Sequence, residues 1–450
     1  MVSFVEAPAV PDSSSIADFI KTVPASGLLV AYSGGLDSSV LLHLVSKAAS
    51  ATGLPVRAVH VDHKLHDKSG EWSQFCVEQC DALGIAITVV SVDVATTKDI
   101  GPEAAARDAR YNCIAGVLRM NELLLTAHHL DDQAETFLLQ AFRGAGLPGL
   151  SGMPMLTEFS KGFHARPLLG IPREALKAYA EEHRLNWIDD PSNNSLHFDR
   201  NYLRLQVFPG ILKRWPGARQ TLARATQHCS DGERIVAGAC RSILGDNAIG
   251  PLQLDLLAVQ DRSMAAALLR VWIRDNNLPV PSETKIRQVL DEVIPAGEDA
   301  EPEVTWSGGE IRRYRQRLYC MPRLPGVAED LTDYLPLEDT ALPLGGTIRW
   351  LESDTGGVRL ETLQQSGWQL RFRRGGERIQ PAGHAQHREL KKLFQEQGVL
   401  PWARNLLPLF FHNNQLIAVA DLWLASEATS EHEGPLLRPV WHQRPLIIAK

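Results

Sequence analysis

The sequence has few cysteines, and none of them stands in a chemically typical arrangement. Its 450 residues include only six, and no two form a C-x-x-C pair. A structural zinc site normally needs such pairs or cysteines grouped with histidines, so zinc is disfavoured. We expect reduced thiols, as in cytosolic proteins.

Long apolar runs are missing as well. No stretch approaches the roughly 18 to 20 apolar residues that a membrane-spanning helix needs. The first residues, MVSFVEAPAVPDSSS, have neither the basic start nor the apolar centre of a signal peptide. These absences predict a cytoplasmic protein without a membrane partner.

Neither sign of charge dominates. The chain has 46 basic and 53 acidic residues, a net charge of -7, and 44% apolar residues. This composition is typical of a soluble globular protein and excludes a uniformly basic nucleic-acid coat. At about 100 to 200 residues per domain, the length predicts two to four domains.

Residues 27–126 alternate short apolar runs with longer amphipathic segments. We expect strands at 27–32, 56–61, 86–92 and 122–126, each followed by a helix. This alternation predicts an α/β fold with a parallel sheet that helices cover on both faces. Polar residues follow three of these strands, at the carboxyl edge where such sheets bind ligands. These residues are 33–37, 62–63 and 128–132.

The pattern changes after residue 215, where we expect the α/β domain of residues 1–215 to end. Helical segments at 218–243 and 263–274, with no strong strand before Thr305, predict a mainly helical domain over 216–324. Residues 325–361 hold eight acidic side chains against two basic ones, so we interpret 325–365 as an acidic linker. Short strands at 370–373, 407–411 and 416–420 and a helix at 388–397 predict a small α+β domain over 366–450.

The first motif with chemical meaning lies between the first expected strand and its helix. It consists of Ser33, Gly34, Gly35, Leu36, Asp37 and Ser38. Glycines let backbone N–H groups converge on an anion, and the helix adds its own N–H groups and dipole. The alternative is a tight turn with Asp or Ser as the helix cap. The Walker patterns GxxxxGKS and GxxxxGKT are absent, which disfavours kinase-like use of ATP.

Acidic and imidazole groups follow the fourth expected strand. His128, Asp132 and Glu135 have i, i+4, i+7 spacing, and Asp131 is beside them, so several could share a helix face. Such a group suits binding of Mg²⁺-ATP or removal of a proton from an attacking amine. The alternative is a capping box at Asp132 and Glu135, with His128 satisfying a loop.

Arginines form the next candidates. Arg107 and Arg110 share a helical segment with Glu103, and their guanidinium groups could stabilise charge on an α-phosphate. An exposed Glu103–Arg107 pair is the alternative.

Two runs are locally basic. Residues 184–224 hold seven basic and three acidic side chains, and residues 371–392 hold seven and two. With Trp215 and Trp402 nearby, these runs predict RNA contact, although a solvated basic face is the alternative. The candidate RNA-binding residues are Arg200, Arg204, Arg371, Arg373, Arg374, Lys391 and Lys392.

SGGLDS resembles the PP-loop of the N-type ATP pyrophosphatases, which cleave ATP between the α and β phosphates and adenylate a substrate. Further runs resemble bacterial tRNA(Ile)-lysidine synthetase over most of residues 25–210, and LRFRRGGERI and HRELKKLFQEQGV do so more loosely. The family usually has Arg where this chain has His66. The stronger runs are VDHKLH at 61–66, EAAARDARY at 103–111, LLTAHHLDDQAETFLLQAFRGAGLPGLSGM at 124–153, RPLL at 166–169 and DDPSNNSLHFDRNYLR at 189–204.

The resemblance implies an ATP-dependent ligase that joins L-lysine to C2 of cytidine 34 in the CAU anticodon of tRNA(Ile). An adenylated cytidine would form first, with release of diphosphate and then AMP. Residues 33–38 would bind ATP, Asp37 would bind Mg²⁺, and Asp131 or Asp132 would bind or deprotonate the lysine ammonium. The predicted catalytic residues are Asp37, Arg107, Arg110, His128, Asp131 and Asp132.

Three other functions fit parts of the sequence. A tRNA thiolase of the same superfamily would generally need paired reactive cysteines or a cluster. A nucleotide-sensing RNA-binding protein would need no acid–base groups beside the phosphates, and a GMP-synthetase-like ligase would not obviously need two basic runs. A homodimer is compatible with the sequence, which does not determine the oligomeric state.

Overall fold

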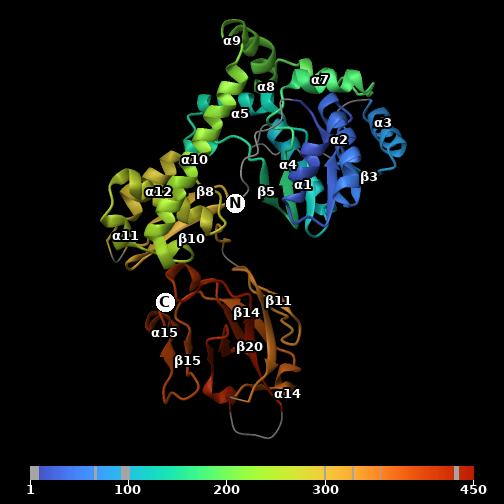
Figure 1. Cartoon of the computed structure of the whole chain (residues 1–450). Coiled ribbons are helices and arrows are strands. Elements are labelled where there is room, and N and C mark those ends of the chain that lie inside the picture. The colour runs from blue at the N-terminus through green and yellow to red at the C-terminus, as the bar shows by residue number, and fades with distance from the viewer. Residues whose placement is uncertain are drawn as a thin grey trace. The chain divides into compact units, whose positions relative to one another are not determined.

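The structure is a computed structural model that describes residues 10–64, 68–92, 102–297, 300–326, 329–354, 356–429 and 435–449. The chain forms two compact units, residues 1–235 and residues 236–450 (Figure 1). The division lies within helix α10 (Ala218–Leu244), whereas we expected the first domain to end at residue 215. Among the described helices, none has the length and apolarity that crossing a bilayer requires.

A six-stranded sheet forms the centre of the first unit, with strand order β3-β2-β1-β4-β6-β5. Neighbouring strands are parallel except β5 and β6, so the predicted parallel sheet is confirmed and a hairpin extends it. The strands are β1 (Gly27–Ala31), β2 (Val56–Asp62), β3 (Ala86–Ser91), β4 (Glu122–Leu125), β5 (Leu156–Phe159) and β6 (Gly162–Ala165).

Helices cover both faces of this sheet. Leu28 and Val30 of β1 point into a core shared with α1, α2 and α7, whereas Leu29 packs with Ile114 of α4 on the opposite face. Alternate residues of a strand face opposite sides, which is why a doubly covered strand needs a continuous apolar run. The helices are α1 (Ser13–Lys21), α2 (Leu36–Thr52), α3 (Ser69–Ala82), α4 (Pro102–Val117), α5 (Leu130–Phe142), α6 (Leu147–Leu150), α7 (Arg173–Glu182), α8 (Asp199–Tyr202), α9 (Phe208–Arg214) and α10.

Strand β3 departs from the expectation that every strand is buried. It lies at the edge of the sheet, and Val89 is 41% exposed. An edge strand has only one neighbouring strand, so apolar residues there are less enclosed than in β1 or β4.

A buried ion pair joins strands at the amino edge of the sheet. Nε of Arg57, near the start of β2, donates to Oε1 of Glu122 at 2.7 Å, and Nη2 donates to Oε2 at 2.6 Å. Glu122 is the first residue of β4 and is 3% exposed. Because β1 lies between β2 and β4, this pair spans three strands at the end opposite the polar carboxyl edge.

The second unit begins with helices packed on a small antiparallel sheet of order β7-β10-β9-β8, around a core that includes Trp272. The predicted helices at 218–243 and 263–274 are confirmed by α10 and α12, whereas the sheet was not predicted. The elements are β7 (Leu252–Gln253), α11 (Leu254–Ala258), α12 (Arg262–Asp275), α13 (Glu283–Gln288), β8 (Glu303–Trp306), β9 (Gly309–Tyr314) and β10 (Arg317–Met321).

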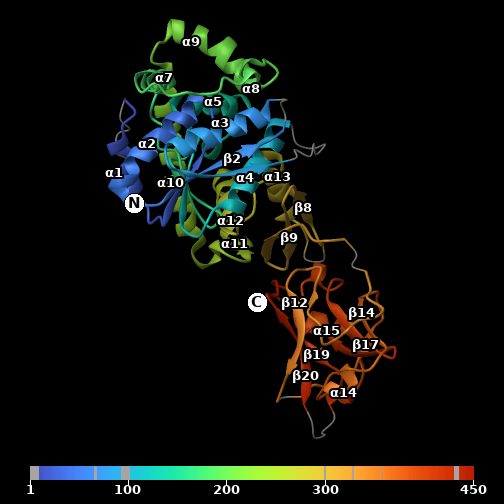
Figure 2. The ribbon, with the colours of Figure 1, turned by 90° about the vertical axis from the view of Figure 1, so that its right-hand side faces the viewer.

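The rest of the second unit is an α+β structure with two four-stranded antiparallel sheets around one core (Figure 2). The three predicted strands are confirmed by β14, β17 and β18, and the predicted helix by α15. The elements are β11 (Thr340–Ala341), β12 (Thr347–Glu352), β13 (Val358–Arg359), α14 (Leu360–Leu363), β14 (Trp368–Phe372), β15 (Arg378–Ile379), β16 (Arg388–Glu389), α15 (Leu390–Glu396), β17 (Pro408–His412), β18 (Gln415–Val419), β19 (Trp423–Leu424) and β20 (Leu436–His442).

Residues 340–363 differ from the acidic linker that we expected. Strand β12 pairs with β20 along its whole length, and its Ile348 and Trp350 are buried in the core. The acidic side chains of this segment, Glu352, Asp354 and Glu361, are exposed at or beyond the end of β12, so this segment belongs to a sheet despite its charge.

Candidate active site

The loop between β1 and α2 has the backbone of an anion-binding cradle. Gly34 has φ +81°, and a Cβ there would lie 2.8 Å from Cδ1 of Ile188 and 3.0 Å from Sγ of Cys76. Gly35 precedes α2 as its cap and supplies no side-chain hydrogen bond, so the capping alternative does not fit. The first N–H groups of α2 therefore remain available to an anion.

Two serines brace this loop. Oγ of Ser38 lies 3.1 Å from Oγ of Ser33 and donates to the carbonyl oxygen of Gly35 at 3.0 Å. The backbone N–H of Ser33 donates to Oγ of Ser38 at 3.3 Å. Ser38 is buried and Ser33 is exposed, so Ser38 shapes the loop while Ser33 can face a ligand.

Asp37 lies in the first turn of α2. Its Oδ2 is 3.6 Å from Nε2 of His129, and its Oδ1 is 3.7 Å from Nε of Arg173. Oδ1 is buried without a hydrogen-bond partner among the described residues. A carboxylate oxygen without a hydrogen bond fits Mg²⁺, which needs only one or two carboxylates when phosphates supply further ligands. No three described His, Cys, Asp or Glu side chains form a metal cage, so phosphates would have to complete such a site.

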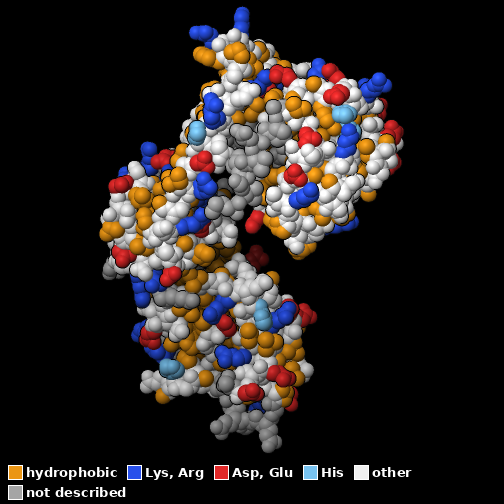
Figure 3. Space-filling view, viewed as in Figure 1, with side chains coloured by type: hydrophobic (Ala, Val, Ile, Leu, Met, Phe, Trp, Pro, Cys, Tyr) orange, Lys and Arg blue, Asp and Glu red, His pale blue; other side chains and the backbone are white. Residues whose placement is uncertain are grey.

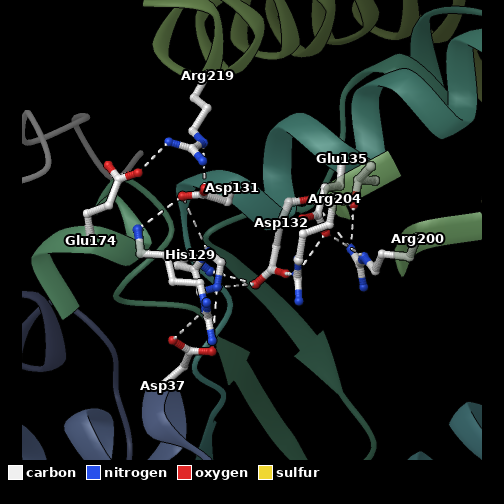
Figure 4. Close-up of polar contacts among 11 residues, drawn as sticks. Asp37, His129, Asp131, Asp132, Glu135, Glu174, Arg200, Arg204 and Arg219 are labelled. Atoms are coloured by element: carbon white, nitrogen blue, oxygen red, sulfur yellow. Dashed lines mark hydrogen bonds and ion pairs between the residues drawn. The ribbon is translucent and has the colours of Figure 1, made fainter. Parts of the chain in front are cut away.

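His129, rather than His128, is the imidazole that faces the carboxylates (Figure 4). It is 1% exposed, with Nε2 3.5 Å from Oδ2 of Asp132 and Nδ1 3.8 Å from Oδ2 of Asp131. Burial lowers the pKa of His129, but the charges of Asp132, Asp37 and Asp131 outweigh burial and raise its pKa overall. Sequence reasoning missed this residue, although the His-His pair before the helix was the available signal.

The predicted placement of His128 on a helix face is wrong, because α5 begins at Leu130. Nδ1 of His128 lies 2.9 Å from Oγ1 of Thr126, which is also 2.8 Å from Nε2 of His164. Burial lowers the pKa of His128 to about 3, and the charge of Arg166 contributes to this shift. His128 is therefore neutral near pH 7.

The carboxylate of Asp131 is held from two directions. Oδ1 of Asp131 lies 2.5 Å from Nε of Arg219 in α10, and Oδ2 accepts the backbone N–H of Arg173 at 3.0 Å. Arg219 also binds Oε1 of Glu174 at 2.9 Å. The first turn of α10 is thereby attached to the first turn of α5.

Arg200 and Arg204, which we predicted to contact RNA, contact carboxylates of α5. Nε of Arg204 lies 2.7 Å from Oε1 of Glu135, and Nη2 lies 3.2 Å from Oδ1 of Asp132. Nε of Arg200 lies 3.1 Å from Oε2 of the same glutamate. In this arrangement both guanidinium groups neutralise buried acids, and their contact with RNA stays a prediction. The capping contact of Asp132 is also different from the predicted one, because its Oδ2 accepts the N–H of His129 at 3.0 Å.

The two candidate phosphate-binding arginines are both exposed on α4. Nε of Arg110 donates to Nε2 of His63, which follows β2, at 3.2 Å. The guanidinium of Arg107 lies 5.6 Å from the centre of the Tyr111 ring. The Glu103 side chain of the alternative pair and His66 lie outside the described residues. Both arginines stay candidates for phosphate binding.

The basic residues predicted in the C-terminal part have unlike surroundings. The guanidinium of Arg371 lies 4.4 Å from the centre of the Phe411 ring. That of Arg373 lies 5.8 Å from the centre of the Phe394 ring. The exposed members are Arg374, Lys391 and Lys392. Their role in RNA binding stays a prediction.

The raised pKa of His129 predicts a pH-dependent stability. A group whose pKa is raised by folding stabilises the fold fully below its unfolded pKa of about 6.5, and this stabilisation is lost as pH rises through the folded pKa. The difference in thermal unfolding midpoint between the wild type and His129→Asn should therefore shrink as the pH rises above about 6.5. His197→Asn, at an exposed position, serves as the control. A difference that is constant over this range would contradict the raised pKa.

Comparison with known proteins covers both units. Three family models match: a PP-loop domain at residues 8–211, a TilS substrate binding domain at 252–319 and a TilS substrate C-terminal domain at 368–441. Among solved structures, a U34-tRNA thiolase from Methanococcus maripaludis has a TM-score of 0.41 at 17% identity, covering 48% of this chain and 76% of its own. That likeness is too distant to inform the reaction.

Relatives with assigned names are much more similar. The chain is 40% identical over 413 residues to the tRNA(Ile)-lysidine synthase of Alkalilimnicola ehrlichii. The matched region covers 90% of this chain and 92% of the relative. It is 36% identical over 441 residues to that of Pectobacterium atrosepticum, covering 96% and 99%. With such identity over nearly the whole length of both proteins, the chain belongs to the tRNA(Ile)-lysidine synthase family.

Proposed function

We propose that this chain catalyses the ATP-dependent joining of L-lysine to C2 of cytidine 34 in tRNA(Ile), which forms lysidine. The observation that carries the proposal is the meeting of the open cradle at 33–38 with the His129 carboxylate cluster at one edge of the sheet. The cradle suits a nucleotide, and the cluster suits an amine. Membership of the family supports the same reaction.

In the first step, O2 of the cytidine attacks the α-phosphate of ATP and diphosphate leaves. The backbone N–H groups at the start of α2 would hold the leaving diphosphate. Mg²⁺, held by Asp37 and the phosphates, would supply positive charge to the phosphate oxygens. Arg107 or Arg110 would stabilise the charge that develops on the α-phosphate.

In the second step, the lysine ε-amine forms a bond to C2 while the bond from C2 to the adenylated oxygen breaks and AMP leaves. An ε-ammonium with a pKa near 10.4 is mostly protonated at pH 7, so an acceptor must take its proton. Burial raises the pKa of Asp132, but His129, Arg200 and other groups lower it overall to about 2. So weak a base suits Asp132 to binding the ammonium rather than to accepting its proton.

The thiolase alternative is not favoured. Sulfur transfer needs a reactive thiolate, and burial raises the pKa of Cys76, Cys80 and Cys320 to about 12. Cys76 is the thiol against the cradle, and it is fully buried. A nucleotide-sensing RNA-binding protein without catalytic activity would give no role to the acid–base groups beside the cradle.

The substrates and location follow from this reaction. Lysine, ATP and a tRNA(Ile) with a CAU anticodon are the proposed partners, and the cytoplasm is the proposed location because tRNA is processed there in bacteria. A homodimer stays a prediction.

A direct assay tests the function. Purified protein is incubated with ATP, Mg²⁺, radiolabelled lysine and unmodified tRNA(Ile) bearing CAU. We expect one lysine per tRNA with equal release of AMP, and none with a matched tRNA that has uridine at position 34. Failure to label the CAU tRNA, with folded protein and tRNA, would overturn the proposal.

A further inference from the structure

A tryptophan is exposed at the junction of α9 and α10. Trp215 is 62% exposed, whereas tryptophan side chains are largely buried in most folded proteins. The guanidinium of Arg214 lies 5.9 Å from the centre of its ring, and Lys213 is exposed beside it. Figure 3 shows hydrophobic and basic side chains together over the end of α9. This surface combines an aromatic face with positive charge.

The junction is held in place by the fold. The backbone N–H of Trp215 donates to the carbonyl oxygen of Ile211 at 2.8 Å, and its own carbonyl oxygen accepts from Ala218 at 3.0 Å. Leu212 of α9 packs against a small core that contains Phe208 and Ala134 of α5. The segment that carries the exposed ring is thus packed against α5, the helix that carries the site carboxylates. The ring therefore belongs to a preformed surface.

The junction is also close in sequence to a residue that contacts the carboxylate cluster. Only one helical turn after Trp215, Arg219 contacts Asp131, and Figure 4 shows its side chain reaching from α10 to that carboxylate. The hydrogen bond between Trp215 and Ala218 folds the chain back at this point. Trp215 therefore precedes, by four residues, the arginine that contacts the carboxylate cluster.

We propose that Trp215 and Arg214 form a stacking platform for an unpaired base of the substrate's anticodon loop. The proposal rests on the proposed function. Proteins recognise single-stranded RNA loops by stacking bases on aromatic rings and guanidinium planes, and an enzyme that modifies a base must draw it out of its stack. Trp215 offers a surface for a base that has lost its neighbour, and Arg214 and Lys213 complement the phosphates. That adjacent positive charge favours RNA over a second copy of the chain as the occupant.

The test compares Trp215→Ala and Trp215→Phe with the wild type in binding to a hairpin RNA that carries the CAU loop. Stacking of one base is worth about 1–3 kcal/mol, so the alanine variant should bind about 5- to 150-fold more weakly. Trp215→Phe keeps an aromatic face and should restore most of the affinity. A fully paired RNA of equal length should bind equally to all three. In the complete assay, the KM for tRNA should rise while the KM values for lysine and ATP stay unchanged.

Met120→Ala is the matched control, because Met120 is 67% exposed and precedes β4 at the opposite edge of the sheet. Wild-type affinity of Trp215→Ala for the hairpin would overturn the proposal, and so would an equal loss for the paired RNA. A change in oligomeric mass with unchanged hairpin affinity would identify a second copy as the occupant and also overturn it. Hairpin binding that depends on Trp215, in a protein that incorporates no lysine, would support the platform and refute the proposed function.

Discussion

Asp37→Ala is expected to slow formation of the adenylated tRNA about a thousandfold or more. The buried Oδ1 of Asp37 has no hydrogen-bond partner among the described residues, and its carboxylate lies beside the phosphate cradle. Loss of about 4 kcal/mol of charge stabilisation in the transition state corresponds to such a factor. Single-turnover transfer of the labelled α-phosphate of ATP to tRNA measures this step without lysine.

Two further variants separate charge from shape. Asp37→Asn keeps the size of the side chain, so a comparable defect together with a higher Mg²⁺ requirement would identify charge as the cause. Asp18→Ala removes an exposed carboxylate of α1 and should leave adenylation unchanged. Adenylation by Asp37→Ala at the wild-type rate would show that our interpretation of the cradle is wrong.

Arg204→Ala is expected to lower the free energy of unfolding by about 3 kcal/mol. Glu135 is 2% exposed at its side chain, and removal of one partner from a buried ion pair leaves a charge without compensation. The effect should lie at the low end of the range of about 3–5 kcal/mol, because Arg200 still contacts Glu135. Urea-induced unfolding, followed by amide hydrogen exchange in residues 1–235, measures the loss.

A second substitution tests whether the uncompensated charge of Glu135 causes this loss of stability. Glu135→Gln in the Arg204→Ala background should recover part of the lost stability, because a neutral amide costs less to bury than a carboxylate. The control is Arg234→Ala, whose partner Asp231 is also exposed, and little change is expected there. Equal stability of the wild type and Arg204→Ala would contradict the structural importance of this pair.

The sequence was sufficient for elements whose signal is local. The first four strands of the first unit, β1 to β4, have largely apolar runs, and the helices between them have a 3.6-residue period. Strands β5 and β6 have only four residues each, too few for a clear alternation. In β12, the charge of the surrounding region obscured the buried Ile348 and Trp350.

The residues of the candidate site also differ in how far the sequence alone could predict them. The cradle was predictable because its residues are contiguous and lie between a strand and a helix. The choice between His128 and His129 depends on where α5 begins, because a shift of one residue changes which imidazole caps the helix and faces the carboxylates. The contacts of Asp131 with Arg173 and Arg219 join distant parts of the chain, and the excess of basic residues near 200 does not reveal which way each guanidinium points.

The ion pair between Arg57 and Glu122 bears on how such an enzyme evolves. It fastens three strands at one end, while the reacting groups occupy the other end of the same strands. Variation at the reacting end usually costs stability, and a robust scaffold tolerates more of it before folding fails. Because the ion pair stabilises the amino edge, the carboxyl edge can tolerate more substitutions, including those that change substrate preference.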